Sequence, residues 1–90
     1  MRYTVSLSKE ATKELDRLDR KTEKRIQDRL EELAAAPYSD RLSIELVMSP
    51  GRRYSRVGNW RILYQVIDSQ KVIDVSAVQH RSRVYKELKK

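Results

Sequence analysis

The chain has 90 residues, of which 37% are charged, and a formal net charge of +7 at pH 7. This length suits one domain with a single modest core, so we expect residues 1–90 to form one domain. Without cysteine there are no disulfides or thiolate metal sites. No stretch approaches the roughly 18 apolar residues of a membrane span. We therefore expect a cytoplasmic protein with no metal, cofactor or membrane contact.

The positive charge is concentrated in the second half of the chain. Residues 1–45 hold ten Lys/Arg and ten Asp/Glu and are neutral overall. Residues 46–90 hold ten Lys/Arg and three Asp/Glu, so this half carries the whole net charge of +7. A generally basic, solvated surface is one interpretation. A polyanionic partner is the better one, and nucleic acid is the commonest polyanion.

Residues 2–36 predict a strand followed by two helices. Residues 2–7 alternate between apolar and polar side chains, as a strand with one buried face does. Ser8 and Asp19 have the character of helix N-caps, and Pro37 ends the second helix. The apolar stripes of the two helices are Ala11, Leu15 and Leu18, then Ile26, Leu30, Leu33 and Ala34. The charged residues between them balance in sign and predict a solvated face: Lys21, Glu23, Lys24, Arg25, Asp28, Arg29, Glu31 and Glu32.

Residues 37–50 are a connector that carries both prolines. The alternation of Leu42, Ile44 and Leu46 fits either a short edge strand or a loop, and the sequence leaves this open. Three strands then follow, at about 52–57, 60–67 and 72–79.

Gly58-Asn59 predicts a two-residue hairpin turn between the first two of these strands. This turn places Arg56 opposite Arg61. If Ser69-Gln70 forms the second turn, Ile62 pairs with Ala77. One face is then an apolar core face made of Trp60, Ile62, Tyr64, Val66, Ile73, Val75 and Ala77. The other is an open face made of Arg52, Tyr54, Arg56, Arg61, Leu63, Gln65, Asp74, Ser76 and Val78.

These elements predict an α+β domain, in which two helices pack on one face of a sheet dominated by three antiparallel strands. On the open face, Arg52, Arg56 and Arg61 lie near Tyr54, and residues 46–67, which contain them, hold no acid to neutralise them. Arginine forks match phosphate oxygens, and like charges opposite each other on a sheet destabilise it. An exposed face with snorkelling arginines is the alternative; an anionic ligand accounts for more of the pattern.

The C-terminal segment adds further candidates for nucleic-acid contact, namely His80, Arg81, Arg83, Tyr85 and Lys86. The lone histidine is a surface residue or the one group able to exchange protons near neutral pH. Tyr85 either stacks on a base or packs its ring under the sheet. Arginines, tyrosines and one histidine suit RNA cleavage without metal, in which the 2′-OH attacks the adjacent phosphate and arginines stabilise the transition state.

The strings Arg56-Val-Gly-Asn-Trp-Arg-Ile-Leu-Tyr-Gln-Val-Ile-Asp68 and His80-Arg-Ser-Arg-Val-Tyr85 resemble the C-terminal half of RelE-type toxins of the RelE/ParE superfamily. The resemblance implies a RelE-like fold of strand, two helices and three strands with a short C-terminal helix. It also implies a type II toxin that cleaves mRNA on the ribosome. Its expected partners are the ribosome, mRNA and a cognate acidic antitoxin, with which it would form a hetero-oligomer.

The resemblance also implies roles for individual residues. Arg61 would stabilise the scissile phosphate, Arg81 would act at the leaving group, and Tyr85 would stack on the message. Arg52 replaces a lysine thought to help activate the 2′-OH, and Tyr54 replaces a second basic residue. His80 is the expected proton carrier. The residues expected to bind RNA are Tyr54, Arg56, Arg83 and Lys86.

Two other functions remain open at this point. One is a ParE-like toxin that binds DNA gyrase and cleaves nothing. The other is a basic RNA-binding module without toxicity.

Overall fold

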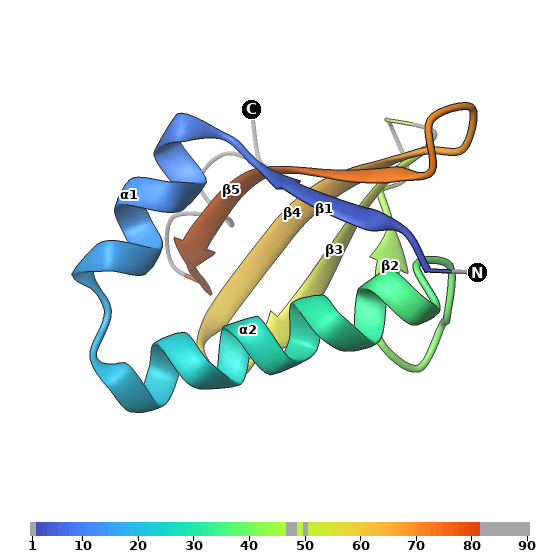
Figure 1. Cartoon of the computed structure of the whole chain (residues 1–90). Helices are drawn as coiled ribbons and strands as arrows, with labels where there is room; N and C mark the ends of the chain where they lie inside the picture. Colours follow the sequence, from blue (N-terminus) through green and yellow to red (C-terminus); the bar gives the residue numbers. More distant parts are fainter. Residues whose placement is uncertain (1, 47–48, 50, 82–90) are drawn as a thin grey trace.

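The computed structural model describes residues 2–46, 49 and 51–81. Along the chain these form β1 (Thr4–Leu7), α1 (Lys9–Arg17), α2 (Arg20–Ala35), β2 (Ile44–Glu45), β3 (Arg52–Val57), β4 (Trp60–Ile67) and β5 (Val72–His80). Both helices lie on the same face of the sheet (Figure 1), which confirms the predicted α+β class. The predicted C-terminal helix lies outside the described residues. Among the described helices, none is long and apolar enough to cross a membrane.

Side-chain caps begin both helices, as predicted. The Ala11 amide donates to the Ser8 hydroxyl at 3.0 Å, and the Thr22 amide donates to the Asp19 carboxylate at 3.2 Å. Each cap satisfies one of the backbone donors that a helix N-terminus leaves open. The second helix ends before Pro37, whose ring is incompatible with a helix interior.

The five strands lie in the order β1-β5-β4-β3-β2. The first strand runs parallel to β5, and the other neighbours are antiparallel, so the sheet is mixed. The connector does form an edge strand, but only Ile44 and Glu45 pair with β3. Beyond Tyr54, no described strand pairs with the outer edge of β3.

A single core lies between the helices and the sheet. The buried helical residues are Ala11, Leu15, Ile26, Leu30, Leu33 and Ala34, as the stripes predicted. The buried apolar residues of the sheet are Val57, Ile62, Tyr64, Val66, Ile73, Val75 and Val78. Trp60 and Leu18 are partly buried against this cluster.

The predicted register holds for the β3–β4 hairpin and for the first half of the β4–β5 hairpin. Tyr64 pairs with Val75, as expected, but Leu63 pairs with Ala77. Ser76 is therefore an extra residue that has no partner of its own on β4. Such a β-bulge shifts the alternation of side chains by one position.

The bulge corrects the predicted faces of the last strand. Val78, not Ala77, lies opposite Ile62 and is buried, with 2% of its surface exposed. Alternation of residue types does not reveal a bulge, because both Ala77 and Val78 are apolar. A contact between distant segments accompanies it: the Ser8 hydroxyl donates to the Ser76 carbonyl at 2.7 Å.

Candidate functional site

Two arginines face each other across the β3–β4 hairpin. Arg56 pairs with Arg61, as predicted from the turn. Gly58 has a φ of +60°, which suits the first central residue of a two-residue hairpin turn. Like charges directly opposite each other weaken a sheet, so an anion bound between them would relieve this register.

The structure buries Arg61, contrary to the expected open position. Only 3% of this residue is exposed, and its Cζ lies 5.8 Å from the centroid of the Tyr54 ring. Its strand is the central one of five, and the half-buried Tyr54 packs against the guanidinium through a cation–π contact. Arg61 is therefore a buried cation at the centre of the sheet.

The other two arginines of the face, Arg52 and Arg56, are exposed. They alternate with buried residues along β3, which fixes them on the side of the sheet away from the helices. Arg52 lies opposite Gln65, so it stands further from the turn than the Arg56–Arg61 pair.

Arg81 lies beside the same turn. Its backbone amide donates to the Asn59 carbonyl at 2.7 Å, and the residue is exposed. Gln79, two residues earlier, lies directly opposite Arg61. The described residues thus bring Arg56, Arg61 and Arg81 to one end of the sheet. The predicted contacts of Arg83, Tyr85 and Lys86 lie outside the described residues.

His80 lies on the other side of the sheet from Arg61. It pairs with Trp60, and the two rings meet edge to face with centroids 5.5 Å apart. Trp60 packs against the core, so this is the side that the helices cover. The bulge at Ser76 is the reason, because it shifts every later residue of β5 to the opposite face.

The family profile described as "ParE toxin of type II toxin-antitoxin system, parDE" matches residues 5–85. The chain belongs to the RelE/ParE toxin family. A RelE-like toxin protein of Escherichia coli is 30% identical to this toxin over 83 residues, or 92% of this chain and 87% of that protein.

Solved structures agree with this fold. A mutant of Escherichia coli toxin RelE in its free state gives a TM-score of 0.80 at 26% identity, over 98% of this chain and 95% of that one. The archaeal RelE–RelB complex from Pyrococcus horikoshii gives 0.78 at 25% identity, over 92% and 99%. The RelE-like fold expected for this toxin is therefore confirmed.

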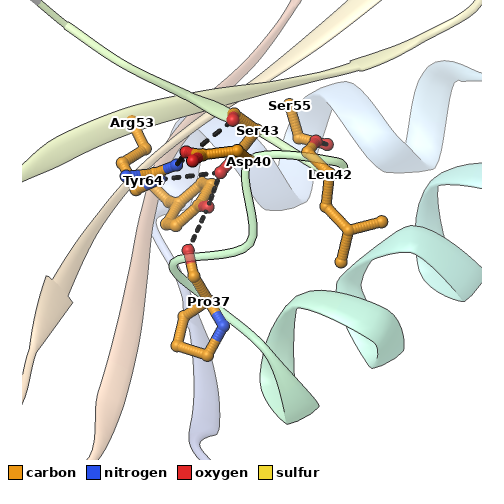
Figure 2. A network of polar contacts seen from close by, with 7 residues as sticks. All are labelled: Pro37, Asp40, Leu42, Ser43, Arg53, Ser55 and Tyr64. Carbon is orange, nitrogen blue, oxygen red and sulfur yellow. Dashed lines mark hydrogen bonds and ion pairs between the residues drawn. The ribbon is translucent and has the colours of Figure 1, made fainter.

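Arg53 is a buried residue of the toxin that the sequence analysis did not single out. It is 6% exposed, and its Nε donates to the Ser43 hydroxyl at 2.7 Å. Its Nη2 donates to the Ser43 carbonyl at 3.1 Å and lies 3.3 Å from Asp40 (Figure 2). The alternation of side chains along β3 could have revealed this burial. Arg53 lies on the same face as Ser55, which pairs with the core residue Ile62.

The Tyr64 hydroxyl joins this network from β4. It donates to the Pro37 carbonyl at 2.8 Å and lies 2.7 Å from the Ser43 hydroxyl (Figure 2). Burial is the main cause that raises the pKa of Tyr64, so the phenol is neutral at physiological pH. The network fixes the connector against the back of the strand that carries Arg52, Tyr54 and Arg56.

A second polar cluster of the toxin lies in the β4–β5 turn. The Asp68 carboxylate accepts hydrogen bonds from the hydroxyls of Tyr3 and Tyr38, both at 2.5 Å. The bond from Tyr3 is the largest cause that lowers the pKa of Asp68, followed by that from Tyr38. The bond to Asp68 in turn raises the pKa of Tyr38 to about 12. The cluster ties the N-terminal segment and the connector to this turn.

Arg29 departs from the solvated face predicted for α2. Its Nη1 donates to the Ser55 hydroxyl and to the Arg56 carbonyl, both at 2.8 Å. Its Nε also lies 3.3 Å from Glu32, one turn further along the helix. Arg29 therefore covers the edge of β3 where no described strand continues the sheet.

Proposed function

We propose that this toxin is a ribosome-dependent mRNA endonuclease. The observation that carries the proposal is the convergence of Arg56, Arg61 and Arg81 at one end of the sheet. These arginines come from two acid-free stretches of the sequence, residues 46–67 and 75–86. Fixed guanidinium groups stabilise the charge that develops on a phosphate during attack by the neighbouring 2′-OH. The kinship with RelE toxins supports the same activity.

In this proposal, Arg61 and Arg56 bind the scissile phosphate and Arg81 assists the leaving 5′-oxygen. Arg52 orients the strand further from the turn, and Tyr85 stacks on a base. Tyr54 holds the Arg61 guanidinium through its ring. Arg83 and Lys86 bind the RNA backbone.

The position of His80 does not support a role for its imidazole in proton transfer to or from the RNA. Its ring packs on Trp60, on the helix-covered face, whereas Arg61 lies on the other face. We infer that His80 supports Trp60 and that the 2′-OH is activated by orientation and by arginine charge.

We further propose an acidic antitoxin as partner in the cytoplasm. The relatives include a complex of the RelE mutant with an antitoxin RelBc peptide, at 26% identity and a TM-score of 0.78. An acidic segment is complementary to a chain of net charge +7.

Single-turnover cleavage on programmed ribosomes tests the enzymatic proposal. Arg81 is exposed, so Arg81→Ala removes charge without opening a core cavity. Loss of one transition-state donor is expected to slow cleavage by about a hundredfold or more. Arg20→Ala, an exposed arginine at the start of α2, is the matched control and should cleave normally. His80→Gln should cleave within about threefold of wild type, since His80 lies on the face of the sheet opposite Arg61.

Full cleavage by Arg81→Ala would contradict the arginine mechanism. A large loss in a folded His80→Gln variant would instead assign proton transfer to the histidine.

A gyrase inhibitor is the second candidate, because the matching family profile is that of the ParE toxins. Inhibition of DNA supercoiling by the purified protein, with mRNA on programmed ribosomes left intact, would establish that function in place of cleavage.

A further inference from the structure

A basic pocket of about 200 Å³ lies at the edge of β3, next to the Arg56–Arg61 pair. Its lining combines one helix, the connector and β3, and comprises Arg29, Asp40, Arg41, Leu42, Ser43, Ile44, Tyr54 and Arg56. The lining holds three arginines and one aspartate, and Glu32 lies 3.3 Å from the Nε of Arg29 as a second carboxylate beside the pocket. The Asp40 carboxylate lies 3.3 Å from the buried Arg53, so its ion pair is with an arginine that does not line the pocket.

The three arginines differ in how they are held. Arg29 is fixed by the Ser55 hydroxyl and the Arg56 carbonyl. Arg41 and Arg56 are exposed, and within the described part of the chain no ion pair joins either to a carboxylate. The pocket therefore presents one arginine that protein partners hold, Glu32 among them, and two arginines that no described carboxylate pairs.

The basic character extends along α2. Arg25, one helical turn before Arg29, lies against the β3–β4 turn: its Nη1 would be 3.6 Å from a Cβ placed on Gly58. Arginines four residues apart on a helix repel each other. Glu32 offsets part of this repulsion at Arg29, and an anion bound at the edge of the sheet would offset more of it.

The pocket is continuous with the arginine face. Arg56 lines the pocket and also lies opposite Arg61. Tyr54 likewise lines the pocket and contacts Arg61. A strand of RNA whose phosphate is bound at Arg56 and Arg61 can therefore pass over the edge of β3 to Arg41 and Arg29.

We propose that this edge pocket binds a second backbone phosphate of the RNA, away from the scissile one. The inference rests on the proposed action on RNA and names the residues that hold the strand outside the cleavage point. The pocket and the arginine face form one continuous basic surface. RNA suits such a surface better than an acidic peptide does, because every nucleotide carries a negative charge.

The test measures binding rather than cleavage. Fluorescence anisotropy is recorded with 2′-O-methyl RNA, which lacks a free 2′-OH, as a trinucleotide and as an oligonucleotide of about nine residues. For single-stranded RNA, the magnitude of the slope of log K against log salt decreases by about 0.7 for each phosphate that the protein ceases to neutralise. Arg41→Gln should lower this magnitude for the longer RNA and leave that for the trinucleotide unchanged.

Arg20→Gln is the matched control, because it removes the same charge from an exposed position nine residues before Arg29 on α2. Equal slopes for Arg41→Gln and Arg20→Gln on the longer RNA would overturn the proposal. Binding of pentaglutamate, an acidic peptide, is measured in parallel. If Arg41→Gln loses pentaglutamate binding and keeps RNA binding, the pocket accepts acidic peptides and the proposal is also overturned.

The outcome is separable from that of the cleavage assay. If the wild-type protein fails to cleave mRNA on ribosomes, the enzymatic proposal is refuted. If Arg41→Gln nevertheless makes RNA binding less dependent on salt, the proposal of the phosphate pocket stands.

Discussion

The Asp68 carboxylate shows how one residue joins three segments that are distant in sequence. It accepts hydrogen bonds from Tyr3 and Tyr38, and the Lys71 ammonium lies 5.0 Å from the centroid of the Tyr3 ring. Lys71 adopts a φ of +54°, a conformation that non-glycine residues rarely take. The turn that the sequence placed at Ser69-Gln70 is thus held by contacts that a local pattern does not reveal.

These bonds predict a pH dependence at both ends of the scale. Because the pKa of Asp68 is lowered on folding, its stabilising contribution is present above the ordinary value of 3.8 and is lost as the pH falls through the lower, folded value. Because the pKa of Tyr38 is raised from 10.0 to about 12, its contribution is lost as the pH rises across that interval.

Tyr38→Phe should raise the pKa of Asp68 toward its ordinary value, as measured by NMR titration of the carboxylate. The same variant should remove a tyrosine that ionises near pH 12 from the ultraviolet titration. An unchanged Asp68 titration would show that the Tyr38 bond does not form in solution.

At the scale of elements, local chemistry predicted most of the fold. Ser8 and Asp19 cap their helices as expected, and Gly58 fixes the register of β3 against β4. Local chemistry did not reveal the bulge at Ser76 or the buried network of Arg53. A bulge depends on which register packs better, and a buried arginine depends on partners such as Ser43 that are distant along the chain.

The core between α2 and the sheet supplies a stability prediction. Leu30 is 3% exposed in the central cluster, so Leu30→Ala should lower the free energy of unfolding by about 2–5 kcal/mol through lost burial and cavity formation. Urea denaturation measures this change. Gln27→Ala, at an exposed position of the same helix, is the control and should change it by less than about 0.5 kcal/mol. A Leu30→Ala variant as stable as the control would contradict the packing described for α2.

At the scale of the whole molecule, the two halves of the sequence differ in net charge, but the fold brings basic residues of both halves together. The neutral first half supplies the helices, β1 and β2, and the basic second half supplies the other strands. In the fold, Arg29 and Arg41 of the neutral half join Arg56 of the basic half at one pocket. The sequence predicted the positive charge of the second half, whereas the extent of the basic surface required the structure.

This charge predicts how the proposed antitoxin associates. Replacing Arg52 and Arg56 by Glu changes the net charge by four units, from +7 to +3, on the face away from the helices. Electrostatic steering governs association more than dissociation, so the rate constant for antitoxin binding should fall by about tenfold or more at low salt. Stopped-flow measurements at low and high salt follow this change. An unaltered rate would indicate that the antitoxin is captured elsewhere on the toxin.

The extra residue at Ser76 also bears on how motifs are transferred between relatives. The letters His-Arg describe the last residue of β5, which lies on the side of the helices, and the residue after the strand, which lies beside the hairpin turn. A relative with the same letters but one residue fewer in the strand would present that histidine on the opposite face. Equivalence of sites within the family must therefore be judged by counting strand residues from the β4–β5 turn, with the bulge included. An alignment that closes this position as a gap would match two histidines that occupy opposite sides of the sheet.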